Sequence, residues 1–225
     1  MANKKKTLGI IHAAIFTANA IQPFADKYLP DVEIMHCGDD TIQRDNFNAP
    51  VGTIPKHNFL KFANLADGMQ RVGCDALLLG CSTFNQAAEY AQPMIDIPIF
   101  QIDRPMMDLA VSMGKKIGLL GTVPSTMPSS ERLLKKAAAD AGKEIEIVTK
   151  LNAEAFGILR GGDAKTHNDM LVKDILEMEA QGIDCVVLAQ VSMAIMQERA
   201  NEIHVPMLTS GETCFKFLAD FFAKL

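Results

Sequence analysis

The feature that most constrains this chain is a pattern of short apolar runs separated by helix-like segments. The runs predict strands at Thr7–His12, Asp31–His36, Asp75–Gly80 and Ile97–Ile102, and a helix over Phe59–Val72. The apolar runs do not alternate in polarity, so both faces of each strand are expected to be buried, as in a parallel sheet. This alternation is typical of an α/β fold built from βαβ units.

The second half of the chain repeats the first at a nearly constant offset. Gly9 in KKTLGII corresponds to Gly118 in GKKIGLL, 109 residues later. Asp75 in GCDALLLGCST corresponds to Asp184 in GIDCVVLAQVS at the same offset of 109. We therefore expect two similar α/β lobes, each with a mainly parallel four-stranded sheet flanked by helices. A pseudo-twofold axis would relate the lobes, with a cleft between them.

Ligands of open α/β sheets bind at the carboxyl ends of the strands, so the residues that follow the predicted strands form the candidate site. Cys81 follows Gly80 in LLLGCSTFNQ, and the equivalent position in VVLAQVSMAI holds Gln190. His12 ends the first strand, whereas its counterpart in the second half is Gly121. The site is therefore expected to be asymmetric.

The surroundings of Cys81 favour a reactive thiol. A free cysteine has a pKa of about 8.5, which a helix N-terminus can lower. We predict a helix at Phe84–Ala91, capped by Ser82 or Thr83, whose open N–H groups could also hold a carboxylate. Gly80 would allow a sharp turn and the approach of a ligand. The alternative is that Cys81 is a small buried residue without chemistry.

Composition excludes several classes of protein. The 225 residues carry a net charge of −5, which argues against a nucleic-acid partner. No run of about 18 apolar residues predicts a membrane span, and MANKKKTLGI lacks the apolar core of a signal peptide. The five cysteines are odd in number and lack metal-binding spacing, which favours free thiols in the cytoplasm and no metal site.

The doubled pattern, the GCSTFN and GTVPST loops and the IDRPM turn resemble the aspartate/glutamate/hydantoin racemase superfamily over essentially the whole chain. Maleate isomerase and arylmalonate decarboxylase belong to the same superfamily. The resemblance implies chemistry without a cofactor at the carbon next to a carboxylate. In members with two cysteines, one thiolate removes the proton and a second thiol returns one from the opposite face. Cys81 matches the first cysteine, but Gln190 occupies the second position, which indicates a single-cysteine branch.

The resemblance, together with the strand ends, gives the expected site. Cys81, His12 and Gln190 are the expected catalytic residues, although His12 could instead be a hydrogen-bonded structural histidine. Hydroxyl groups that follow the strands are expected to bind the substrate, with helix capping as the alternative for several: Ser82, Thr83, Thr122, Ser125, Thr126, Ser192, Thr209 and Ser210. Cys185 is expected to be buried in a strand, and Cys214 to pack in the core.

By the same resemblance, the lobes comprise residues 1–103 with 209–225, and residues 104–208. The expected function is a cofactor-independent racemase or isomerase of a small carboxylic acid, with Cys81 as thiolate base or nucleophile. One alternative is a decarboxylase or lyase in which Cys81 protonates a carbanion from one side. Another is an inert protein that binds small carboxylates. Dimers are common in the family, so a homodimer is also an expectation.

Overall fold

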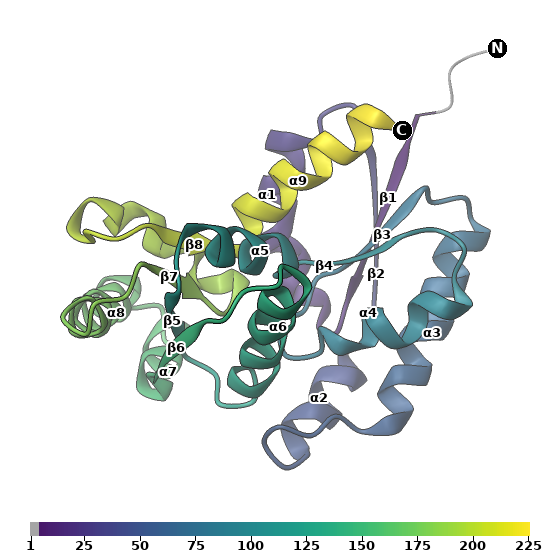
Figure 1. Ribbon diagram of the computed structural model, residues 1–225. Coiled ribbons are helices and arrows are strands. Elements are labelled where there is room, and N and C mark those ends of the chain that lie inside the picture. The colour runs from purple at the N-terminus through teal and green to yellow at the C-terminus, as the bar shows by residue number, and fades with distance from the viewer. Residues whose placement is uncertain (1–4) are drawn as a thin grey trace. The chain divides into compact units, whose positions relative to one another are not determined.

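The structure is a computed structural model that describes residues 5–225 (Figure 1). The chain divides into two compact units, unit 1 (Met1–Ile102 with Cys214–Leu225) and unit 2 (Asp103–Thr213). Asp103 and residues 209–213 thus fall in unit 2, whereas the sequence-based boundaries placed them in the first lobe. Thr209 pairs with Leu188 in the sheet of unit 2, which explains its position there.

Unit 1 contains a four-stranded parallel sheet in the order β2-β1-β3-β4. Its strands are β1 (Thr7–His12), β2 (Glu33–Gly38), β3 (Ala76–Leu79) and β4 (Ile99–Gln101). Its helices are α1 (Ala18–Tyr28), α2 (Asp40–Asn48), α3 (Lys56–Arg71), α4 (Gln86–Ala91) and most of α9 (Ser210–Lys224), with short 3-10 turns at Ile15–Thr17 and Gln92–Met94.

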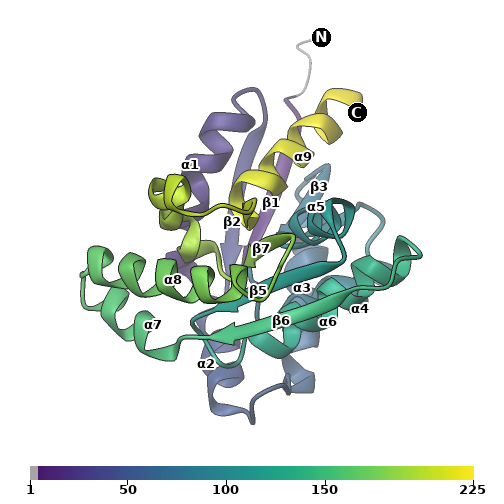
Figure 2. The same ribbon diagram turned by 60° about the vertical axis from the view of Figure 1, so that its left-hand side comes forward.

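The two faces of the unit 1 sheet are covered by different helices. Phe62 of α3 and Phe84, in the turn before α4, belong to a core cluster that includes Leu77 of β3. Helices α1 and α9 lie side by side in Figures 1 and 2, and their rings Phe24 and Phe215 stack with centroids 6.2 Å apart. Burial of the central strands on both faces follows from this arrangement, as their continuous apolar runs predict.

Unit 2 repeats this design with the strand order β6-β5-β7-β8. Its strands are β5 (Lys116–Gly121), β6 (Glu146–Leu151), β7 (Cys185–Leu188) and β8 (Met207–Thr209). Its helices are α5 (Arg104–Met113), α6 (Met127–Asp140), α7 (Ala153–Arg160), α8 (Ala164–Glu179) and the 3-10 segment Val191–Glu202. The predicted α/β class with two four-stranded parallel sheets is therefore confirmed.

The repeated aspartates have the same structural task in both units. The Asp75 carboxylate accepts a hydrogen bond from the backbone N–H of Thr7 at 2.7 Å. The Asp184 carboxylate accepts from the N–H groups of Lys115 and Lys116 at 2.7 and 2.8 Å. Each carboxylate ties the residue before one central strand to the start of the other, so it satisfies backbone donors that the ladder leaves open.

The repeated glycines are explained by close packing. A β-carbon at Gly9 would lie 2.8 Å from a methyl of Leu77 and 2.9 Å from the methyl of Met69. At Gly118 it would lie 2.9 Å from methyl groups of both Ile183 and Met178. Side chains of the covering layer thus press directly on the backbone of the first strand in each unit.

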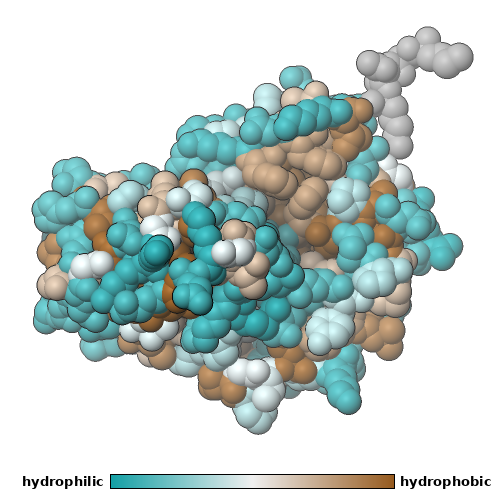
Figure 3. Space-filling view, in the orientation of Figure 1, coloured by the Kyte–Doolittle hydropathy of each residue, from teal (hydrophilic) through white to brown (hydrophobic). Residues whose placement is uncertain are grey.

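Hydrophilic residues cover much of the face seen in Figure 3, and apolar residues form a continuous area in its upper centre. Within residues 5–225, every helix is too short or too polar to cross a lipid bilayer.

Candidate active site

His12 and Cys81 follow two adjacent strands at one end of the unit 1 sheet. Ile11 of β1 is in register with Leu79 of β3, and the N–H of Gly80 donates to the carbonyl of Ile11 at 2.9 Å. Cys81 is a free cysteine, half-buried, and its side chain packs against the unit 1 core. The structure therefore brings the two predicted residues to the same carboxyl edge, where ligands of α/β sheets bind.

Close packing explains the glycine at position 80. A β-carbon there would lie 2.9 Å from Ile21 and 3.5 Å from the Nδ1 atom of His12. The glycines with positive φ among the described residues lie elsewhere, so Gly80 does not adopt the left-handed conformation. The bare α-carbon instead makes room for helix α1 and for the imidazole of His12.

The predicted helix after Cys81 starts later than expected. Helix α4 begins at Gln86 behind Asn85, and neither Ser82 nor Thr83 caps it. Residues 83–85 form a turn that carries Phe84 into the core, where it is fully buried against Phe59 and Phe62. Burial of this large ring outweighs an earlier helix start. A helix N-terminus consequently does not adjoin Cys81, so a helix dipole does not stabilise its thiolate.

Ser82 and Thr83 nevertheless remain beside the thiol in the chain. Ser82 is buried, and its hydroxyl has no hydrogen-bond partner in the described part of the protein. Thr83 is half-buried. A buried hydroxyl without a partner costs free energy unless a ligand or water completes it, so Ser82 is a good candidate contact.

Both ring nitrogens of His12 are occupied. Its Nδ1 lies 2.8 Å from the Thr17 hydroxyl and its Nε2 lies 2.8 Å from Nδ1 of His36. The Thr17 hydroxyl donates its own proton to the Ala14 carbonyl at 2.7 Å, so it accepts from His12 Nδ1–H. In neutral His12, Nε2 must then accept a hydrogen bond from the Nδ1–H of His36. No ring nitrogen of His12 is left to meet a substrate.

The pair continues outward through helix α1. Nε2 of His36 lies 2.6 Å from the side-chain oxygen of Gln22, whose amide N–H donates to Asp26 at 2.6 Å. Because the Gln22 oxygen can only accept, this contact is complete when His36 carries protons on both nitrogens. A first proton added to the pair therefore belongs on His36, the more exposed of the two rings.

Burial dominates the titration of these histidines. Desolvation, followed by repulsion from His36, lowers the pKa of His12 from 6.5 to about 4. Desolvation also lowers the pKa of His36. His12 is therefore neutral at physiological pH, and its geometry is that of a hydrogen-bonded structural histidine.

The equivalent edge of unit 2 holds an amide instead of a thiol. The side-chain oxygen of Gln190 accepts from the backbone N–H of Thr122 at 3.1 Å and contacts the Thr122 hydroxyl at 3.5 Å. Gln190 is 8% exposed, and its Nε2 has no hydrogen-bond partner among the described residues. The Thr122 contact fixes the orientation of the amide, so the available group is an N–H donor.

The remaining predicted hydroxyl groups of unit 2 differ in exposure. Ser210 is fully buried and Ser125 half-buried, and neither hydroxyl has a partner in the described chain. Thr126 is a buried residue before α6 whose side chain makes no capping bond, and Thr209 is buried at the end of β8. Ser192 is exposed. Thr122 follows β5 and Thr209 ends β8, and these two strands flank β7, so the structure groups both residues with Gln190 at one sheet edge.

The other cysteines of unit 2 and α9 do not replace the missing thiol. Cys185 is fully buried in β7, and burial raises the pKa of its thiol to about 11. Cys214 is fully buried in α9. Among residues 5–225, no cluster of three or more His, Cys, Asp or Glu side chains is placed to hold a metal ion.

Comparison with known proteins identifies the family. The family model described as Asp/Glu/Hydantoin racemase matches residues 52–217, which is more than half of the chain. The protein therefore belongs to the Asp/Glu/hydantoin racemase family, a family of isomerases. The matched region contains Cys81 and Gln190 but neither His12 nor His36. A search of curated proteins finds no match.

Solved structures with the same fold include racemases of different substrates. Glutamate racemase from Francisella tularensis in complex with D-glutamate is 17% identical, with a TM-score of 0.73 over 98% of this chain and 82% of that one. An aspartate racemase homologue from Pyrococcus horikoshii is 19% identical, with a TM-score of 0.75 over 97% and 99%. Allantoin racemase from Klebsiella pneumoniae is 17% identical, with a TM-score of 0.69 over 97% and 88%. At these identities the likeness shows the shared fold.

His36 was not predicted from the sequence as the partner of His12. The available signal was its place near the end of the second predicted strand, next to the first in a parallel sheet. Register pairs Ile10 with His36 and so brings the two rings together, with centroids 5.0 Å apart.

Proposed function

We propose that this protein is a cofactor-independent racemase or isomerase of a small carboxylic acid, with Cys81 as the thiolate base or nucleophile. The observation that carries the proposal is the place of Cys81 in a member of a racemase family. It is a half-buried free cysteine at the carboxyl end of β3, whereas Cys74, Cys185 and Cys214 are buried. Proton removal next to a carboxylate needs such a base within reach of the carbon.

Ser82 and Gln190 supply the polar contacts in this proposal. The unpartnered hydroxyl of Ser82 and the unpartnered N–H of Gln190 would hydrogen-bond the carboxylate or the negative charge that develops beside it. Thr83, Thr122, Ser125, Thr126, Thr209 and Ser210 are further proposed contacts. Ser192, which is exposed, is the weakest member of the predicted set.

Inversion at the carbon also needs a group that delivers a proton on the face opposite Cys81. The amide of Gln190 does not exchange protons usefully near neutral pH, and both nitrogens of His12 are engaged within the protein. A water molecule is therefore the proposed acid on the face opposite Cys81. This same observation favours a second candidate function, a decarboxylase or lyase that needs a proton from one side only.

The proteins of similar fold suggest a class of substrate for this proposal. The solved structures named above include proteins described as racemases of glutamate and allantoin, and a homologue of aspartate racemase. We propose an amino acid or a related acid or ureide with a proton on the carbon next to its carbonyl group.

Incubation in heavy water with a panel of such acids tests the proposal. Racemisation or isomerisation predicts deuterium at the α-carbon with the carbon skeleton intact, and decarboxylation predicts release of carbon dioxide. Cys81→Ala should abolish either signal, whereas Cys37→Ala, which changes another half-buried cysteine of unit 1, should retain it. Binding of an acid without exchange or release would contradict the proposal and leave the inert binding protein.

A further inference from the structure

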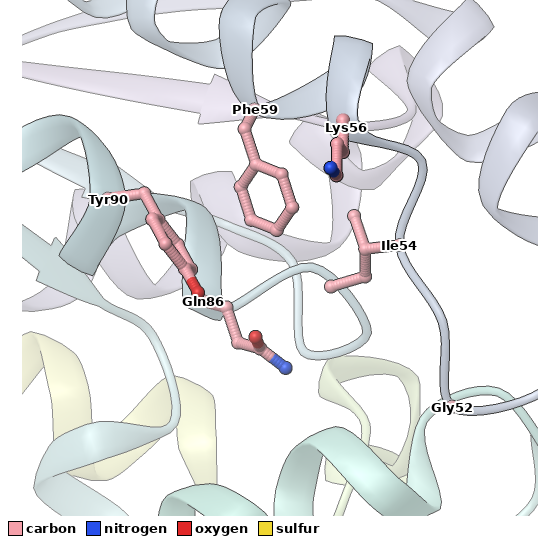
Figure 4. A pocket seen from close by; sticks show the side chains of 6 residues that line it. All are labelled: Gly52, Ile54, Lys56, Phe59, Gln86 and Tyr90. Atoms are coloured by element: carbon pink, nitrogen blue, oxygen red, sulfur yellow. The ribbon is translucent and has the colours of Figure 1, made fainter.

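Unit 1 contains a recess that Cys81 does not line. It has a volume of about 380 Å³ and lies between the start of α3 with its preceding loop and one face of α4 (Figure 4). Its lining consists of Gly52, Ile54, Lys56, Phe59, Gln86 and Tyr90. Cavities of a few hundred cubic ångströms are typical for small ligands.

The apolar wall of the recess is built on the core. Ile54 and Phe59 pack against the core cluster of unit 1. The Phe59 ring contacts the ring of Tyr90, with centroids 4.7 Å apart and planes inclined by 56°. Tyr90 is nevertheless 63% exposed, so much of its ring faces solvent beside the recess. An apolar group entering here would bury surface of both aromatic rings.

The polar rim carries a positive charge without a partner. The exposed Lys56 ammonium has no ion pair or hydrogen bond within residues 5–225, and Figure 4 shows it beside Phe59 and Ile54. Asp45, the acidic residue that binds the nearby Lys61 and His57, is already engaged by both. The Gln86 amide also lacks a partner in the described chain and lies across the recess in Figure 4. An anion can therefore form an ion pair with the Lys56 ammonium without breaking an existing contact.

The loop that closes the recess is shaped by Gly52. Its φ of 84° lies in the left-handed region, which favours glycine. The turn at Gly52 is followed by Ile54, whose side chain points into the recess in Figure 4.

We propose that this recess binds a small carboxylate with a branched apolar or aromatic group. Lys56 binds the carboxylate, Gln86 donates a hydrogen bond, and Ile54, Phe59 and Tyr90 enclose the apolar group. The proposal does not rest on chemistry at Cys81, because none of the predicted catalytic residues lines the recess.

The chain offers a direct spectroscopic test. It contains no tryptophan and two tyrosines, so in a Tyr28→Phe background Tyr90 is the only tyrosine that fluoresces. The probe is 4-methylpentanoate, which does not absorb at the tyrosine wavelengths. Saturable change of Tyr90 fluorescence is expected, with saturation-transfer NMR of the probe's methyl groups as the second measurement.

Two comparisons separate charge from apolar contact. The uncharged 4-methylpentanamide and the small acid acetate should each bind more weakly than 4-methylpentanoate. Lys56→Gln should weaken the pentanoate about threefold to fivefold, as expected for an exposed ion pair. Lys165→Gln is the matched control, since Lys165 is also an exposed lysine in the first turn of a helix.

The outcomes decide the proposal. Equal affinity of Lys56→Gln and Lys165→Gln, or equal binding of the acid and its amide, overturns the role of Lys56. Absence of both the fluorescence change and the NMR signal overturns the site itself. In Cys81→Ala, the exchange of the substrate α-proton in heavy water should be lost while 4-methylpentanoate still binds. This result would show that the recess binds its ligand independently of the thiol.

Discussion

The two units share a scaffold but differ in the chemistry at their strand ends. Both have the same strand order. In both, an aspartate accepts hydrogen bonds from the backbone at the start of the first strand, and a glycine in that strand is closely packed. In unit 1, His12 ends β1 and Cys81 follows β3, and unit 2 has Gly121 and Gln190 at the corresponding positions. The aspartate and glycine residues that build the sheets are thus the same in both units, whereas the candidate site positions at the strand ends differ.

The divergence extends to the neighbouring strand and to packing. His36 of β2 is replaced by Thr149 at the same register position of β6. At Gly121, an added β-carbon would collide with the sulfur of Met127. The space that a side chain such as His12 occupies in unit 1 is therefore filled from helix α6 in unit 2. An imidazole could not be introduced there without repacking.

The largest expected effect on activity is that of replacing Cys81. Replacing Cys81 by alanine should lower the rate of α-proton exchange by about 100- to 10,000-fold, the usual contribution of a positioned acid or base. Replacing Gln190 by cysteine should instead raise the rate of α-proton exchange, because a second thiol could exchange the proton on the other face of the carbon. Deuterium incorporation and product handedness measure both, and equal rates in wild type and Cys81→Ala would remove the thiol from the mechanism.

The His12 environment predicts that stability falls in acid. The pKa of folded His12 is about 4, below the 6.5 of the unfolded chain, so the unfolded state binds more protons between these values. The contribution of His12 to the free energy of unfolding should be fully present above pH 6.5. It should decrease by about 3 kcal/mol as the pH falls to 4. Urea unfolding at several pH values measures this slope.

A histidine of unit 2 provides the control for that slope. His12→Asn should flatten the dependence between pH 4 and 6.5, whereas His204→Asn, at an exposed position, should leave it in place. An unchanged slope in His12→Asn would show that other groups dominate acid unfolding.

The shared glycines predict matched losses in both units. Gly9→Ala and Gly118→Ala should each destabilise the protein by about 1–3 kcal/mol, because the new methyl group overpacks a full interior. Gly68→Ala and Gly157→Ala are helical controls with open space around the new β-carbon, and each should gain up to about 1 kcal/mol. Thermal unfolding distinguishes the pairs, and a loss at only one buried glycine would break the equivalence of the units.

The smallest effect concerns the aspartate ties. Asp184→Asn should lower the melting temperature more than Asp75→Asn, because Asp184 accepts from two backbone N–H groups and Asp75 from one. Those bonds lower the pKa of the Asp184 carboxyl, so its contribution is present above the ordinary pKa and lost as the pH falls through the lowered value. Equal shifts in the two variants would show that the number of donors is unimportant.

The sequence predicted those parts of the molecule that depend on local pattern. Continuous apolar runs placed β1 at its observed bounds and the other strands within a few residues, and repeated glycines revealed the second sheet. The start of α4 escaped prediction because it depends on where Phe84 finds a buried position. The His36 contact and the Lys56 recess depend on side chains from separate elements, which no local pattern relates.

The held orientation of Gln190 has a stereochemical consequence under the proposed mechanism. Its carbonyl oxygen is occupied by the Thr122 N–H, so the side chain can present only hydrogen-bond donors to a planar carbanion. A protein of this kind would return a proton to one enantioface faster than to the other. In the decarboxylase alternative, an achiral malonate would then give products with an excess of one hand, whereas a racemase would still bring its substrate to equal amounts of both.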